Sequence, residues 1–125
     1  MSSKDSCLCT EGPKLIFSCS GAADVGSIAD RASRKISQEG IGNMFCLAGI
    51  GGGVSGIIES AKAASQILAI DGCPIDCAKK TLEKAGINDF VHLRVTDHGM
   101  KKGGSPVTEK NIDSIAEVGA SLLVP

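Results

Sequence analysis

The chain has few aromatic side chains, with three phenylalanines and no tyrosine or tryptophan among its 125 residues. Single-stranded nucleic acids and flat cofactors stack on aromatic rings, so neither kind of ligand is expected. The chain also lacks an excess of positive charge, because its 13 basic residues are matched by 14 acidic ones. The sequence therefore predicts no binding to nucleic acid or to an anionic membrane surface.

Long apolar runs are missing as well. Glycine, aspartate or cysteine interrupts the apolar runs before they reach the length that crosses a membrane. Residues 1–12 are polar and lack the apolar stretch of a secretory signal. We therefore expect a cytoplasmic protein with a polar leader at 1–12 and a single domain at 13–125.

Short apolar segments alternate with amphipathic ones along this domain, a pattern typical of α/β proteins. Strands are predicted at 14–18, 43–47, 66–70 and 89–95. Helices are predicted at 24–39, 55–65 and 76–85, and after Pro106 with Thr108 as the N-cap. The predicted fold is a three-layer α/β sandwich, flavodoxin-like or Rossmann-like, with a four-stranded and mainly parallel sheet in the order 2-1-3-4.

The six cysteines are the main chemical signal of the sequence. In a reducing compartment, cysteines are more typical of metal ligands or reactive thiols than of disulfides. Cys19, Cys46 and Cys73 fall at the ends of three predicted strands, at equal spacings of 27 residues. The carboxyl ends of parallel strands share one edge of the sheet, so these thiols should lie together. Cys77, in the first turn of the next helix, can face the same crevice.

These residues suggest a zinc site because Zn²⁺ prefers a tetrahedral set of thiolates. The predicted ligands are Cys19, Cys46, Cys73 and Cys77. With four protein ligands the ion has no open position for water, which favours metal handling or thiol regulation over hydrolysis. In the alternative interpretation, each cysteine is a small buried hydrophobic residue.

The same residues carry a family resemblance. The tripeptide Asp-Gly-Cys at 71–73 is followed by Cys77 and preceded by Cys-Ser-Gly at 19–21 and by Cys46. This arrangement resembles the DGC family of small prokaryotic proteins, which are described as zinc-binding, from Lys14 to the C-terminus. The resemblance implies that the four cysteines chelate a metal, and it implies no enzymatic activity.

A thiol-dependent enzyme is one alternative, with Cys77 as the nucleophile at a helix N-terminus. His98, at the end of the last predicted strand, would be a proton carrier or a further ligand on the same rim. A phosphatase-like or arsenate-reductase-like mechanism based on Cys19 is disfavoured. That chemistry requires an arginine six positions after the cysteine, where this chain has Val25.

Nucleotide binding is a second alternative, because residues 51–56 match the pattern G-x-G-x-x-G through Gly51, Gly53 and Gly56. Asp71 follows Gly51 by 20 residues, where an acid that binds ribose is expected. The glycine N–H groups could instead donate hydrogen bonds to the thiolates or to an anion.

Several residues have weaker expectations. Cys7 and Cys9 lie in the leader without an assigned role, and His92 is expected to contact only solvent. Lys101 and Lys102 are expected in a solvated loop that could attract an anionic substrate. An edge strand and an apolar C-terminal helix are compatible with a homodimer.

Overall fold

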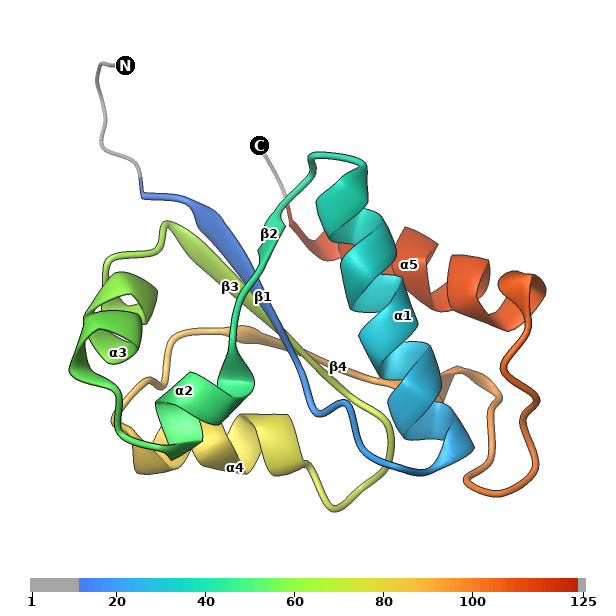
Figure 1. The fold of residues 1–125 in the computed structure, drawn as a ribbon. Helices are drawn as coiled ribbons and strands as arrows, with labels where there is room; N and C mark the ends of the chain where they lie inside the picture. The colour runs from blue at the N-terminus through green and yellow to red at the C-terminus, as the bar shows by residue number, and fades with distance from the viewer. Residues whose placement is uncertain (1–11, 124–125) are drawn as a thin grey trace.

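A four-stranded sheet in the order β2-β1-β3-β4 organises the computed structural model, which describes residues 12–123 (Figure 1). Its strands are β1 (Lys14–Ser18), β2 (Asn43–Met44), β3 (Gln66–Asp71) and β4 (Val91–Arg94). Every neighbouring pair is parallel, and the central strands β1 and β3 pair along the whole of β1. The predicted fold class and strand order are confirmed.

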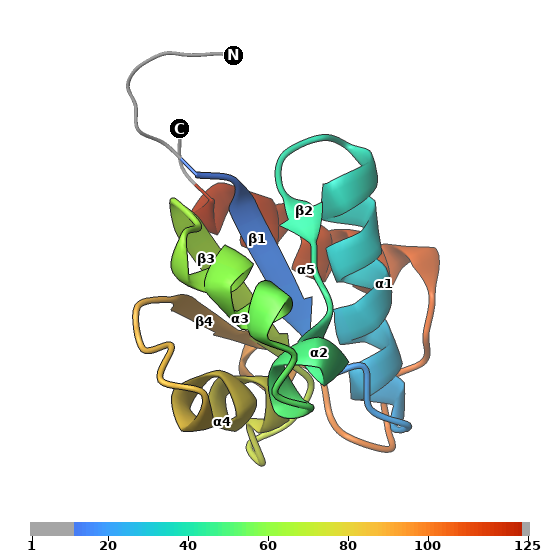
Figure 2. The ribbon, with the colours of Figure 1, turned by 60° about the vertical axis from the view of Figure 1, so that its left-hand side comes forward.

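Helices cover both faces of this sheet (Figures 1 and 2). One layer contains α1 (Asp24–Gln38) and α5 (Glu109–Leu122), and the other contains α2 (Leu47–Gly51), α3 (Ser55–Lys62) and α4 (Cys77–Lys84). Successive residues of a strand point to opposite faces, so Ile16 packs toward α1 and α5 while Phe17 packs toward the other layer. The two apolar faces explain why β1 and β3 are almost wholly apolar.

Helix α1 follows from its sequence pattern. Apolar residues at helical spacing form one stripe, and all of them are buried: Val25, Ile28, Ala29, Ala32 and Ile36. The chain leaves the helix at Gly40, whose φ of +77° favours glycine. Opposite α1, Gly119 of α5 lies so close to Ile36 that a Cβ atom there would be 2.8 Å from the Ile36 side chain. The two helices can therefore pack closely against each other.

The prediction of a strand at 43–47 is wrong in its second half. β2 ends at Met44, and α2 begins at Leu47 with Cys46 as its N-cap. A helix of five residues is too short to show a 3.6-residue period, so the sequence pattern missed it. The pattern also missed a 3₁₀ turn, η2 (Val95–His98), that directly follows β4. The helix predicted at 55–65 ends earlier, at Lys62.

The predicted leader falls at 1–12, and residues 1–11, which include Cys7 and Cys9, lie outside the described residues. None of the helices in residues 12–123 is both long and apolar enough to cross a membrane.

Candidate functional site

The four cysteines of residues 12–123 lie on the loops at the carboxyl ends of β1, β2 and β3, and we call them the cysteine rim. Cys19 directly follows β1, and Cys46 precedes α2. Cys73 follows β3 by two residues, and Cys77 is the first residue of α4. All four are free thiols; Cys46 and Cys77 are exposed, and the other two are half-buried.

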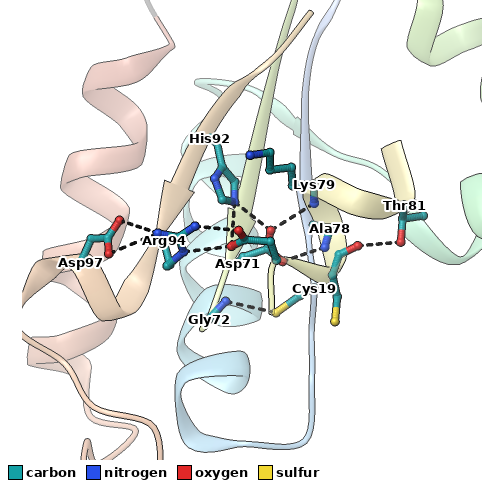
Figure 3. Close-up of polar contacts among 11 residues, drawn as sticks. Cys19, Asp71, Gly72, Ala78, Lys79, Thr81, His92, Arg94 and Asp97 are labelled. Atoms are coloured by element: carbon teal, nitrogen blue, oxygen red, sulfur yellow. Dashed lines mark hydrogen bonds and ion pairs between the residues drawn. The ribbon is translucent and has the colours of Figure 1, made fainter. Parts of the chain in front are cut away.

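Cys19 connects the loop after β1 to the loop after β3. Its Sγ accepts a hydrogen bond from the N–H of Gly72 at 3.3 Å (Figure 3). Burial raises the pKa of the Cys19 thiol, against the opposing effect of the N–H groups of Gly21 and Gly72. The negative charges of Asp71 and Cys77 raise it further. Asp71 and Cys77 therefore both lie close enough to the Cys19 thiol to influence its ionisation.

The Asp-Gly-Cys tripeptide has a structural explanation. The carboxylate of Asp71, which is only 1% exposed, accepts hydrogen bonds from the N–H groups of Ala78 and Lys79 at 2.7 and 3.1 Å (Figure 3). It thereby holds the N-terminus of α4 against the end of β3. A Cβ atom on Gly72 would lie 2.8 Å from the backbone N of Gly26, so this position is restricted to glycine. The aspartate anchors the loop, the glycine packs against α1, and Cys73 carries the thiol.

Side chains of β4 hold the same loop from the neighbouring strand (Figure 3). His92 Nε2 lies 2.8 Å from Asp71 Oδ2, and Arg94 makes two hydrogen bonds to Asp76, of 2.9 and 2.6 Å. The bond from Arg94 holds the pKa of Asp76 below its usual range, and Asp76 in turn raises the pKa of Arg94. The prediction that His92 contacts only solvent is wrong, because its face of β4 turns toward the loop that follows β3.

Asp71, Asp76 and His92 form a cluster in which ligand-type atoms lie within 4.8 Å of one another. The protein already provides partners for both carboxylates: helix N–H groups donate to Asp71, and Arg94 donates to both oxygens of Asp76. We therefore assign this cluster a structural role. Within residues 12–123, no three cysteine sulfurs lie that close together, so the rim is not a preformed tetrahedron.

Cys46 and Cys19 both line a groove of about 710 Å³. Its Sγ accepts a hydrogen bond from the N–H of Gly49 at 3.3 Å. Arg34 in the groove wall forms an ion pair of 2.8 Å with Asp30. Although burial opposes it, hydrogen bonds from Arg34 and from Ser20 keep the pKa of Asp30 below its usual range. This wall of the groove is polar and internally neutralised.

The remaining candidate residues are Lys102, His98 and Cys77. Lys102 is exposed in its loop, as the sequence predicts, and its Nζ lies 3.8 Å from Cys73 Sγ. His98, a candidate ligand or proton carrier, is exposed at the end of η2, and no side-chain hydrogen bond or ion pair joins its imidazole to a residue within 12–123. Cys77, the candidate nucleophile, is exposed, and its carbonyl accepts a hydrogen bond from the Thr81 hydroxyl.

The glycine-rich segment occupies a different position from that of a dinucleotide fingerprint. Gly51 ends α2, Gly53 has a φ of +74°, and Gly56 lies inside α3. The segment therefore joins two helices, whereas the fingerprint joins a strand to a helix. The carboxylate of Asp71 is directed at α4 and at His92. Nucleotide binding at this segment stays an untested prediction for which this geometry offers little support.

Sequence reasoning missed Asp76, His92 and Arg94. A signal was present, because residues 92 and 94 alternate onto one face of a strand and carry positive or titratable groups. Their acidic partners are Asp71, the last residue of the neighbouring strand, and Asp76, in the loop that follows it. Opposite charges on adjacent strand ends could have indicated the pairing.

The DGC domain model matches residues 15–118 of the chain. A curated relative is the "Anaerobic and virulence modulator AnvM" of Pseudomonas aeruginosa. It is 34% identical over 88 residues, which cover 70% of this chain and 67% of the relative. No solved structure matches the chain.

Proposed function

Because this chain belongs to the DGC domain family, we propose that it is a small cytoplasmic protein that binds zinc through the cysteine rim. The observation that supports the proposal is the placement of four free thiols at or just after the ends of three parallel strands, along one edge of the sheet. The ligands would be Cys19, Cys46, Cys73 and Cys77.

The surroundings of the thiols support a metal–thiolate site. Backbone N–H groups donate to the sulfurs of Cys19 and Cys46, a contact that stabilises negative charge on a thiolate ligand. The ammonium of Lys102 lies beside Cys73, where it would offset the net negative charge of four thiolates around Zn²⁺. Because no three sulfurs lie within 4.8 Å in the described residues, zinc binding would require the loops to move closer together.

A bound zinc ion would link loops that are far apart in sequence, and its binding free energy would add to the stability of the fold. A four-thiolate zinc site has no vacant position for water, so it suits a structural or metal-handling role better than hydrolysis. The chain's own contribution is to orient the loops: Asp71 holds the N-terminus of α4, and Arg94 holds Asp76, immediately before Cys77.

Zinc titration of the chelator-treated chain tests the proposal. We expect about one zinc per chain by elemental analysis, with the four rim thiols protected from alkylation until chelator is added again. The Cys73→Ser variant should lose at least about tenfold in zinc affinity. Cys7→Ser, outside the rim, is the matched control and should bind as tightly as the wild type. A chain that binds no stoichiometric zinc while all six thiols react would overturn the proposal.

The thiol-enzyme alternative has less support. The N-terminus of α4, which would activate Cys77, already receives the carboxylate of Asp71. His98 is exposed at the end of η2 and is not held next to a rim thiol by a hydrogen bond within residues 12–123. A substrate-dependent turnover that Cys77→Ser abolishes while zinc stays bound would favour this alternative.

A further inference from the structure

We propose that Cys73 is a modification site for anionic low-molecular-weight disulfides, which Lys102 recruits to its sulfur. The inference goes beyond zinc binding and concerns the metal-free thiol. It rests on the charge next to Cys73 and on the hydrogen bonds that hold the backbone of the loop carrying that charge.

Cys73 differs from its neighbours in the partner of its sulfur. The sulfurs of Cys19 and Cys46 accept hydrogen bonds from backbone N–H groups. The sulfur of Cys73 has a full positive charge at 3.8 Å, the Nζ atom of Lys102. Cys73 is only half-buried and Lys102 is exposed, so a solute can approach the pair from solvent. An anion that pairs with the ammonium would place its neighbouring atoms close to the sulfur.

The loop that carries Lys102 is fixed by several contacts. The carboxylate of Asp24, the first residue of α1, accepts hydrogen bonds from the N–H groups of Gly103 and Ser105 at 2.9 and 3.0 Å. The hydroxyl of Ser105, a residue that is only 7% exposed, accepts the N–H of Lys101 at 2.7 Å. The two N–H groups keep the pKa of Asp24 below its usual range. The backbone on both sides of Lys102 is therefore held next to the N-terminus of α1.

The chemistry is thiol–disulfide exchange. The sulfur of Cys73 attacks one sulfur of the reagent, the reagent's S–S bond breaks, and a new S–S bond joins the reagent to the protein. The proton of the Cys73 thiol passes to solvent, and the released thiolate takes up a proton. A carboxylate on the disulfide pairs with Lys102, which raises the local concentration of the reagent, whereas a neutral disulfide gains nothing from the lysine.

Two reagents of different charge test this inference on the full-length, zinc-free chain. They are dithiobis(nitrobenzoate), which carries two carboxylates, and neutral dithiodipyridine. The rate of modification at each cysteine is followed by mass spectrometry with fragment ions that separate Cys73 from Cys77. For Lys102→Gln we expect the rate of the anionic reagent at Cys73 to fall about three- to tenfold. The rate of the neutral reagent should stay unchanged.

Internal and matched controls accompany the test. Cys46 reports whether a substitution affects thiols in general, and Lys101→Gln removes the adjacent lysine while leaving the pair intact. Raising the salt to about 1 M should reduce the preference of the wild type for the anionic reagent, because the screening length falls to about 3 Å.

Three results would overturn the inference: an unchanged rate of the anionic reagent in Lys102→Gln, an equal loss in Lys101→Gln, or an equal loss with the neutral reagent. The test is separable from zinc binding. Added zinc should protect the rim from both reagents if the proposed function is correct. The preference for the anionic reagent is measured without zinc and does not depend on that result.

Discussion

Gly72 is the residue at which two loops of the rim meet. Its N–H donates to the sulfur of Cys19, and its carbonyl accepts the N–H of Thr96 at 3.2 Å. A Cβ atom at this position would lie 2.8 Å from backbone atoms of both Val25 and Gly26. The first turn of α1 can therefore approach the end of β3 only if residue 72 has no side chain.

The Gly72→Ala variant should be less stable than the wild type by about 1–3 kcal/mol, because the added methyl group forces α1 away from the sheet. Equilibrium unfolding in urea measures the difference. Gly56→Ala is the matched control: this position in α3 has open space for a Cβ atom, and replacing a helical glycine should stabilise the chain by about 0.5–1 kcal/mol. A Gly72→Ala variant as stable as the wild type would contradict the packing argument.

At the scale of elements, strand β4 positions helix α4. Asp76, the N-cap of α4, adopts a left-handed conformation with φ of +58°, which is uncommon for an aspartate and costs conformational energy. The two hydrogen bonds from Arg94 offset that cost, and His92 lies 3.6 Å from the same carboxylate. Because Cys77 comes directly after Asp76, these contacts also fix the backbone position from which the Cys77 side chain extends.

A double-mutant cycle measures this positioning. For Asp76→Asn and Arg94→Gln we expect a coupling free energy of about 1–2 kcal/mol, since the pair is bidentate and mostly shielded from water. Asp30 and Arg34 form the matched control pair within α1, where the arginine side chain is 62% exposed. Their coupling should be about 0.3–0.5 kcal/mol. Equal couplings in the two cycles, measured by urea unfolding, would contradict the view that Arg94 holds Asp76 more strongly than an exposed ion pair would.

For the whole molecule, the rim depends on contacts between distant segments. Asp24 at the start of α1 binds the loop at 101–105, and the contact with Gly103 spans 79 residues of sequence. The lowered pKa of Asp24 makes this contact sensitive to acid. A carboxylate whose pKa is lower in the folded than in the unfolded chain stabilises the fold above the unfolded pKa of about 4. That contribution is lost as the pH falls through the lower, folded pKa.

The Asp24→Asn variant should therefore be less stable than the wild type near neutral pH, and its stability should fall less steeply as the pH drops below about 4. Urea unfolding at a series of pH values gives both free energies. At low pH the two chains should converge, because Asp24 is then protonated in both states. Parallel curves across the whole range would exclude a contribution from the ionised Asp24.

Much of the fold could be predicted from the sequence. The bounds of β1 at 14–18 and the start of α1 at Asp24 are confirmed, because apolar segments and helical periods are local properties of the chain. The N-cap role of Thr108 is also confirmed, since its side chain accepts the N–H of Asn111 at 3.2 Å. The predicted strand order is confirmed as well.

The position of four cysteines at one edge of the sheet could be predicted from their spacing, because the carboxyl ends of parallel strands share that edge. The surroundings of these cysteines became visible only in the folded chain. The contact between His92 and Asp71 spans 21 residues, and that between Lys102 and Cys73 spans 29. The first contact depends on the register of β4 against β3, and the second depends on how the loop at 101–105 folds back toward the end of β3. Alternating charge along β4 hints at the first contact, whereas the local sequence does not indicate the fold of that loop.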